Sequence, residues 1–411
     1  MRWSIDRFLR LTAKSAAVLG IVSLASPQAM AQQKMPEKIR IGYAVSLTGP
    51  FAGAAAMLPV ANYRLWVKDV NAKGGLKVAG FDKRIPIEVI EYDDTSNPEN
   101  AIRLNEKLMV DDKVDFALPP WGSAMNMAVA PVYKKNNYPH LGSTACVNGA
   151  EALTKRFDTL FLFCTDASDF AIGLVEVLTK LKTAAKINSK IALLSVADQF
   201  GADLNAAATR AFKDAGFEVL VNKTYPMASR DLSAEIKQAQ DSGADSFIAF
   251  SYPPDTFLIA AQAQTLNYNP KVFYTGAGTA FPTYKARLGL KTEGVLGVGG
   301  WDRTSPGADA YLDAFKAMMN HEPDRWGSPL VYMSLQTLEQ AIEKIGLDRK
   351  KVIEALRTET FDTIGGKFIF ANQVRRKQQP LVSQWQCDDF VVVQPENMSG
   401  TKPIVFPKPS W

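Results

Sequence analysis

The sequence has few of the residues that most enzymes use for acid–base and metal chemistry. Its 411 residues include only two histidines, His140 and His321, and three cysteines, Cys146, Cys164 and Cys387. The cysteines form no C-x-x-C pair and the histidines are isolated, so no zinc-site spacing is present. We therefore predict no bound metal and interpret both histidines as structural residues.

Recognisable catalytic motifs are also absent. There is no G-x-S-x-G nucleophile elbow and no P-loop, and Gly276-Ala277-Gly278 lacks the rest of a dinucleotide-binding fingerprint. Asp93 and Asp94 resemble a carboxylate pair, but a helix N-cap explains them more simply. We therefore predict a protein that is not an enzyme and that carries no cofactor.

The chain has little net charge once its first segment is set aside. The 47 Lys and Arg residues against 42 Asp and Glu residues give +5, but the first 31 residues hold four of the basic residues and one of the acidic ones. The remaining 380 residues, with 43 basic and 41 acidic side chains, carry only +2. Nucleic-acid binding depends on clustered cations, so we predict no nucleic-acid partner.

No uninterrupted apolar stretch is long enough for a transmembrane helix, which needs about 20 residues. The N-terminus has a basic stretch up to Lys14, the apolar run Ser15–Leu24 and small residues at Ala29-Met30-Ala31. This order is typical of a secretory signal peptide, and an N-terminal membrane anchor is the alternative. We expect cleavage near Ala31 and an exported, soluble mature protein.

Export bears on the cysteines, because an oxidising compartment permits disulfides. An odd number of cysteines leaves at least one thiol unpaired within a monomer. Cys146 and Cys164 each follow an apolar, strand-like run, so they are the first pair to test for a disulfide. Three free, buried cysteines are the alternative.

The length of the chain favours two domains, because single hydrophobic cores stop growing near about 250–300 residues. Apolar β-branched runs alternate with helical patterns, and this alternation predicts parallel βαβ units. Two such blocks, divided around residue 164, predict an α/β fold with two doubly wound parallel-sheet lobes. In the first block the predicted strands are Ile39–Leu47, Ile85–Tyr92, Val114–Leu118 and Pro139–Gly142. In the second they are Leu160–Cys164, Lys190–Val196, Glu218–Tyr225, Ser246–Tyr252 and Lys271–Thr275, with helices between them.

The loops that follow the strands hold the candidate site residues, because ligands of open parallel sheets bind beyond the carboxyl ends of the strands. Ser123 directly precedes a predicted helix, and a hydroxyl with free N–H groups at a helix N-terminus suits a carboxylate. The simpler alternative is that Ser123 only caps its helix. Gly142-Ser143-Thr144 adds hydroxyls after the next strand. Aromatic rings that could sandwich a ligand stand at strand ends, namely Trp121, Phe200, Tyr252 and Trp301.

Four segments, in order along almost the whole mature chain, resemble one known family. Ile41–Leu76 has an L-T-G-P opening and a D-x-N-A-K-G-G-L helix end, and Glu91–Pro98 reads EYDDTSNP. Asp198–Gly201 (DQFG) resembles a D-x-x-Y/F-G segment, and Val331–Leu338 (VYMSLQTL) resembles a Y-x-x-L-Q-x-L helix. Together these segments resemble the periplasmic leucine/isoleucine/valine-type binding proteins of ABC transporters.

The resemblance implies the type I periplasmic-binding fold, in which three crossings join two α/β lobes around a cleft that closes like a hinge. Residues 1–31 would be the signal peptide, 32–164 and 300–372 the first lobe, and 165–299 and 373–411 the second lobe. The resemblance also implies a periplasmic monomer that delivers a small-molecule ligand to an inner-membrane ABC permease. A ligand-sensing receptor on the same fold is the alternative role.

The resemblance also assigns ligand contacts. In the amino-acid binders, a Ser at a helix start and the loop after the next strand hold the ligand carboxylate, and these positions resemble Ser123 and residues 144–146 here. Cys146 stands where a Thr is usual. With the aromatic contacts of the second lobe and the strand-end Trp, the candidate ligand-binding residues are Trp121, Ser123, Thr144, Ala145, Cys146, Phe200, Tyr252 and Ala277.

Two positions depart from the pattern of the amino-acid binders. Ala277 stands where those binders place the Glu that pairs with the ligand ammonium, and Ala54 stands where an aromatic residue commonly closes the pocket. A buried ammonium without its carboxylate is unfavourable. We therefore hypothesise that the ligand is an amino acid or related organic carboxylate that need not be a branched-chain amino acid, such as an aromatic acid. If the correspondence shifts by one or two residues, Asp255 could supply the missing charge.

Overall fold

The computed structural model describes residues 35–164, 166–301, 305–375 and 381–411. The expected signal peptide, residues 1–31, therefore lies outside the described residues. None of the helices within the described ranges is both long enough and apolar enough to cross a membrane.

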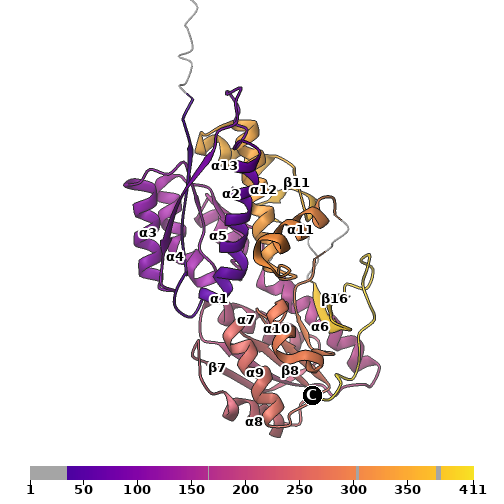
Figure 1. The fold of residues 1–411 in the computed structure, drawn as a ribbon. Coiled ribbons are helices and arrows are strands. Elements are labelled where there is room, and N and C mark those ends of the chain that lie inside the picture. Colours follow the sequence, from indigo (N-terminus) through magenta and orange to yellow (C-terminus); the bar gives the residue numbers. More distant parts are fainter. Residues whose placement is uncertain (1–34, 165, 302–304, 376–380) are drawn as a thin grey trace, which may run out of the picture. The chain divides into compact units, whose positions relative to one another are not determined.

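The first sheet has the strand order β2-β1-β3 and is parallel throughout, with β1 (Ile39–Val45) between β2 (Ile87–Asp93) and β3 (Phe116–Leu118). Almost every residue of β1 is buried, as expected for a parallel strand that is covered on both faces. Helices α3 (Pro98–Val110) and α4 (Ser123–Asn136) pack together on one face of this sheet, whereas α2 (Ala61–Ala72) lies on the other (Figure 1).

A second, four-stranded sheet is built from segments that are far apart in the sequence. Its order is β13-β14-β5-β4, formed by β4 (His140–Gly142), β5 (Leu160–Leu162), β13 (Phe370–Ala371) and β14 (Val374–Arg375). Helix α5 (Ala150–Arg156) connects β4 to β5. Strand β5 pairs with β4, so the predicted strand Leu160–Cys164 belongs with the first block and not with the second, where the sequence order placed it. Val374 pairs with Leu162, so β14 joins the same sheet.

The third sheet has the order β16-β15-β10-β9-β8-β6-β7. Its strands β6, β7, β8, β9 and β10 run parallel, whereas β15 and β16 add an antiparallel edge. The strand bounds are β6 Lys190–Val196, β7 Glu218–Tyr225, β8 Ser246–Phe250, β9 Val272–Thr275, β10 Leu296–Val298, β15 Val382–Gln386 and β16 Asp389–Gln394. The connecting helices are α6 Ala167–Thr183, α7 Gln199–Asp214, α8 Ser233–Asp241, α9 Pro253–Thr265 and α10 Pro282–Leu288, followed by the 3-10 turn Gly289–Thr292.

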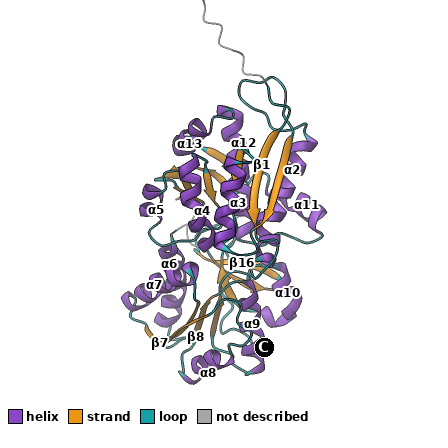
Figure 2. Ribbon diagram, turned by 90° about the vertical axis from the view of Figure 1, so that its left-hand side faces the viewer, coloured by secondary structure: helices purple, strands orange, loops and turns teal. Residues whose placement is uncertain are grey.

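In the sequence, the remaining elements lie between strands β10 and β13. Helices α11 (Ala308–Met319), α12 (Gly327–Ile345) and α13 (Arg349–Thr358) precede the short hairpin of β11 (Phe361–Thr363) and β12 (Gly366–Phe368). Helix α12 packs against α2 and α13, so this late segment completes the core of the first block. Helices and parallel strands therefore alternate in both blocks (Figure 2), which confirms the predicted α/β class.

Local signals in the sequence explain several of the element boundaries. Asn97 caps α3 by accepting from the backbone N–H groups of Glu99 and Asn100, and Pro98 occupies the first helical position as expected. Gly75, at the end of the D-x-N-A-K-G-G-L segment, has a φ of +112° and lies where a Cβ would approach the Ile85 carbonyl carbon to 2.2 Å. Only glycine fits this position.

The first helical segment among the described residues contains a proline. It opens with α1 (Ala52–Ala55), continues through one π-helical turn at Ala56–Val60, and then becomes α2. Pro59 lies inside the π turn, where its missing N–H cannot make the usual bond to the carbonyl four residues earlier. The side chain of Asn62 donates to the Leu58 carbonyl at 2.7 Å. The helical segment therefore continues past Pro59.

The interpretation of Asp93 and Asp94 as a helix cap is wrong, because Asn97 holds that position. Asp93 instead accepts from the backbone N–H groups of Leu47 and Thr48, and Asp94 accepts from the Ser46 hydroxyl at 2.6 Å. These hydrogen bonds lower the pKa of Asp93. The carboxylate pair thus fixes the loop after β1 to the end of β2, which is a structural role.

Candidate ligand-binding site

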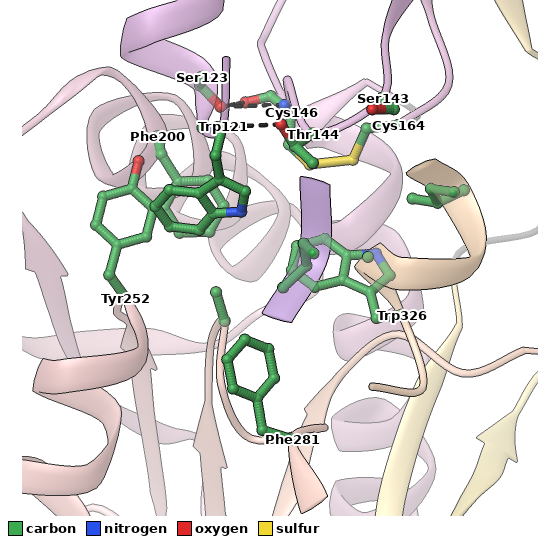
Figure 3. A pocket seen from close by; sticks show the side chains of 15 residues that line it. Trp121, Ser123, Ser143, Thr144, Cys146, Cys164, Phe200, Tyr252, Phe281 and Trp326 are labelled. Carbon is green, nitrogen blue, oxygen red and sulfur yellow. Dashed lines mark hydrogen bonds between the residues drawn. A yellow bond between two sulfur atoms is a disulfide. The ribbon is translucent and has the colours of Figure 1, made fainter. Parts of the chain in front are cut away.

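The loops at the carboxyl ends of the strands meet around one cavity (Figure 3). The space between its lining side chains is about 440 Å³, part of it open to solvent. Both blocks contribute to the lining: Leu58, Trp121, Gly122, Ser123, Ser143, Thr144, Cys146, Cys164, Phe200, Tyr252, Ala277, Phe281, Trp326, Gly327 and Leu330. Every candidate ligand-binding residue except Ala145 is in this set. Ala145 is buried behind the wall in a small apolar cluster with Leu160 and Val374.

The wall on the first block consists of two loops that are hydrogen-bonded to each other. The Ser123 hydroxyl donates to the backbone carbonyl of Cys146 at 2.8 Å and accepts from its N–H at 3.0 Å. The Thr144 hydroxyl accepts from the backbone N–H of Gly122 at 3.0 Å. Hydrogen bonds between side chains and backbone groups therefore join the loop before α4 to the loop after β4.

These bonds change the expected role of Ser123. Gly122, with a φ of 90°, is the N-cap residue of α4, and no side chain caps this helix. The capping alternative for Ser123 is therefore wrong, and its hydroxyl is already bonded to Cys146 on both its donor and its acceptor side. The backbone N–H groups in the first turn of an uncapped helix remain suited to an anion.

Cys146 and Cys164 form a disulfide, which confirms the pair that the sequence analysis puts first. Cys387 is a free, exposed cysteine, so the alternative of three buried thiols is wrong. Both bonded cysteines line the cavity, and Figure 3 shows the sulfur–sulfur bond along its upper wall. The disulfide gives this wall an apolar, polarisable surface.

An aromatic cluster with residues from both blocks lies at one side of the cavity. The Tyr252 ring stacks on Phe200, with ring centroids 5.0 Å apart and an interplanar angle of 19°. Trp121 lies 5.1 Å from Tyr252, and Phe51 contacts both of these rings at 5.2 and 5.4 Å. Phe51 was missed because no strand or helix periodicity marks it. Phe51 supplies an aromatic ring beside the site. Ala54, which stands where an aromatic residue commonly closes the pocket, supplies none.

The positions of Phe200 and Tyr252 follow from Asp198 and Gly201 in the DQFG segment. Asp198 caps α7 by accepting from the Gly201 N–H at 3.0 Å, and its other oxygen accepts from the Tyr252 hydroxyl at 2.7 Å. Burial raises the pKa of Asp198, while these hydrogen bonds act in the opposite direction. A Cβ at Gly201 would lie 1.9 Å from the Val196 carbonyl oxygen, so glycine is required for this turn.

The far wall comes from helix starts that the sequence analysis did not select. Trp326 and Phe281 directly precede α12 and α10, and both line the cavity with Leu58 and Leu330. Asp324 positions Trp326 because its buried carboxylate accepts from the N–H groups at the start of α12, including that of Trp326 at 2.9 Å. An Asp before a helix is a capping signal, but nothing in the sequence indicates that this helix start faces the site.

Several residues considered at the sequence level lie elsewhere. Trp301 donates to the Ile364 carbonyl at 3.1 Å and packs on Tyr311, outside the cavity lining. Asp255 is also outside the cavity lining. Burial raises the pKa of its carboxyl group to about 7, while the nearby backbone N–H groups of Ala228 and Tyr252 act in the opposite direction.

The two histidines lie away from the site. His140 is fully buried, makes a 2.9 Å hydrogen bond with Asn126 and stacks on Tyr133, and burial lowers its pKa to about 3. His321 contacts the Glu322 carbonyl at 2.8 Å. Within the described ranges, no cluster of three or more His, Cys, Asp or Glu residues is arranged to hold a metal.

The cavity is uncharged but not without polar groups. No lining residue within the described ranges carries a formal charge. Three lining side-chain groups make no hydrogen bond with the described part of the chain: the indole N–H groups of Trp121 and Trp326 and the Ser143 hydroxyl. Figure 3 shows the Trp121 nitrogen directed toward the open centre of the cavity. The arrangement therefore offers aromatic surfaces and neutral hydrogen-bond donors.

Comparison with known proteins agrees with this architecture. Residues 38–388 match a family model described as periplasmic binding protein. The leucine-, isoleucine-, valine-, threonine- and alanine-binding protein of Pseudomonas aeruginosa is 26% identical over 336 residues, covering 81% of this chain and 86% of that protein.

Solved structures share the fold at lower sequence identity. A leucine-binding protein of Thermotoga maritima has a TM-score of 0.73 and 19% identity, with 88% of this chain and 100% of that chain covered. An ABC-transporter solute-binding protein of Rhodopseudomonas palustris, solved with 3,4-dihydroxybenzoic acid, has a TM-score of 0.74 and 19% identity, covering 87% and 96%. These likenesses confirm the predicted type I fold, and the chain belongs to the periplasmic binding protein family.

Proposed function

We propose that this protein is the periplasmic solute-binding subunit of an ABC importer and that it captures a small aromatic carboxylate between its two lobes. The observation that carries the proposal is the composition of the cavity wall, which has aromatic rings, a disulfide and neutral donors but no charged residue within the described ranges. We further propose that the protein acts as a monomer and that the expected signal peptide directs it to the periplasm.

The absence of a charged lining residue disfavours a zwitterionic ligand. An amino acid brings an ammonium group, and a buried ammonium needs a carboxylate partner. Ala277 cannot supply one, and Asp255 lies outside the lining. A carboxylate is easier to hold, because backbone and indole N–H groups can donate to it without a counter-charge. The uncapped start of α4 and the Trp121 indole are the donors that we assign to it.

The apolar part of the ligand would fill the rest of the cavity. Flat rings pack well in a space bounded by Trp121, Trp326 and Phe281, since offset and edge-to-face contacts between aromatic groups are favourable. A structural relative was solved with 3,4-dihydroxybenzoic acid, which combines a ring with a carboxylate. An aromatic acid would therefore satisfy both the ring surfaces and the donors.

A branched-chain amino acid is the second candidate ligand, because the relative from Pseudomonas aeruginosa is named as a binder of such amino acids. A thermal-shift panel of benzoate, coumarate, leucine and glutamate separates the two candidates. A ligand present at 100 times its Kd stabilises the folded state by about 2.7 kcal/mol. We expect benzoate or coumarate to raise Tm and leucine to have no effect. A rise in Tm with leucine alone would support the second candidate.

A sensing role on the same fold is distinguished by uptake. If the protein serves an importer, cells that lack it should lose uptake of the labelled ligand, and expression of the full chain should restore it. If it serves a receptor, uptake should continue in the deletion strain while the response to the ligand disappears. Only the first result agrees with the proposed function.

A further inference from the structure

We propose that the Cys146–Cys164 disulfide is a positioning element of the ligand site, so that the protein holds its ligand tightly only in the oxidised form. This inference rests on the proposed function, because it assigns to the disulfide a role in ligand capture. It goes beyond general stabilisation of the fold, because the bond lies in the cavity wall and links the segments that shape it.

The loop that carries Cys146 has no regular secondary structure of its own. Residues 143–149, between β4 and α5, contain no helix or strand. Both backbone polar groups of Cys146 are bonded to the Ser123 hydroxyl, so the position of this loop sets the orientation of Ser123 at the start of α4. A shift of Cys146 would therefore move the wall where we place the ligand carboxylate.

The disulfide anchors this loop to the segment between β5 and α6. Cys164 follows β5 and lies close to α6, the first helix of the second block. Two hydrogen bonds join the same regions, from Ala167 N–H to the Val147 carbonyl at 3.0 Å and from Ala150 N–H to the Asp166 carboxylate at 2.9 Å. The disulfide is the covalent member of this set of links.

The same loop is also hydrogen-bonded to the second block. The backbone N–H of Asn148 donates to the Asp203 carboxylate of α7 at 3.1 Å. Asp203 is on the helix that carries Phe200, one of the rings of the aromatic cluster. The anchored loop therefore contacts both sides of the cavity, and loss of its covalent anchor would loosen both together.

The test compares the full mature chain with a Cys146→Ala, Cys164→Ala double variant, both in a Cys387→Ala background. Cys387 is exposed and is not part of the lining, so its substitution alone should leave loop exchange and ligand binding unchanged. Hydrogen exchange at residues 143–148 reports on the loop without any ligand. Calorimetry with benzoate and with leucine reports on the site.

We expect at least tenfold faster exchange in residues 143–148 of the double variant, with unchanged exchange in strand β8, and at least tenfold weaker binding of whichever probe the parent binds. A lower Tm with unchanged loop exchange and unchanged affinity would overturn the proposal, because the bond would then only stabilise the fold. If the parent binds neither benzoate nor leucine, coumarate is used as the probe. If it binds none of the three, the proposed ligand class fails, and the exchange result alone decides the role of the disulfide.

Reduction of the folded parent provides a second route if the double variant does not fold. Dithiothreitol transfers two electrons and two protons, so the Cys146–Cys164 bond breaks into two thiols while the reagent becomes a cyclic disulfide. The reduced protein should show the same faster exchange and weaker binding, and reoxidation should restore both. Unchanged exchange after complete reduction, confirmed by mass spectrometry of alkylated thiols, would contradict the proposal.

Discussion

The Tyr252 hydroxyl donates to Asp198 Oδ2 at 2.7 Å, while the ring of the same tyrosine stacks on Phe200. This pair links the cap of α7 to the residue before α9, which are two separate strand ends of the third sheet. One hydrogen bond thus sets the position of two cavity-lining rings.

Tyr252→Phe separates the hydrogen bond of Tyr252 from its ring. Loss of a donor to this partly buried carboxylate should lower the free energy of unfolding by about 1–3 kcal/mol, because Asp198 then keeps the Gly201 N–H on only one of its oxygens. The ring stays, so ligand affinity should change by less than tenfold, whereas Tyr252→Ala should weaken binding more strongly. Urea unfolding and calorimetry measure the two effects. Equal losses of affinity in both variants would contradict this division of roles.

Gly201→Ala tests the close approach of α7 to β6. The new Cβ would lie 1.9 Å from the Val196 carbonyl oxygen, so the backbone must shift, and overpacking of this kind costs about 1–3 kcal/mol. Gly53→Ala is the matched control, because nothing lies within 4 Å of its Cβ and it is in helix α1. Alanine should stabilise that helix by up to about 1 kcal/mol. Thermal unfolding should therefore give Tm shifts of opposite sign, and equal shifts would contradict the prediction.

Sequence reasoning located one side of the site better than the other. Trp121, Ser123, Phe200 and Tyr252 follow apolar strands, and the carboxyl ends of parallel strands share one edge, so their convergence on the cavity could be predicted. Trp326 and Phe281 precede helices in the irregular last third and in a short connection. Their place in the lining depends on long-range packing, which local periodicity does not encode.

The same dependence on long-range packing explains why the capping roles predicted for Ser123, Asp93 and Asp94 were wrong. Ser123 has the residue type and place of a cap, but its partner is Cys146, 23 residues further along the chain. Asp93 and Asp94 likewise bond to residues more than 40 positions away. The fold class was predictable because it follows from alternation along the chain, whereas these contacts exist only once the strands are paired.

Asp255→Asn should stabilise the protein more as the pH rises. Burial raises the pKa of Asp255 from its ordinary value of 3.8 to about 7, so the folded state favours the protonated acid. Its favourable contribution is complete below pH 3.8 and is lost as the pH rises through 7. The Tm difference between Asp255→Asn and the parent should therefore grow from pH 5 to pH 7 and then level off. A constant difference over this range would show that Asp255 does not titrate as proposed.

Ala277→Glu tests whether the missing acid decides the ligand class. A carboxylate in the cavity should weaken binding of benzoate or coumarate by like-charge repulsion and should offer a partner to the ammonium of leucine. Ala277→Gln is the control, since it has a similar size without the charge. We expect the Glu variant to lose aromatic-acid affinity by at least tenfold relative to the Gln variant, as measured by calorimetry. Equal affinities in the two variants would show that charge at this position does not select the ligand.

The central claim is that the cavity selects an uncharged ring with a carboxylate and excludes a zwitterionic amino acid. Isothermal titration calorimetry of the mature protein with benzoate, coumarate, leucine and glutamate tests this claim most directly. We predict saturable binding of an aromatic acid and no heat of binding with leucine. Tight binding of leucine, with none of the aromatic acids, would contradict the account.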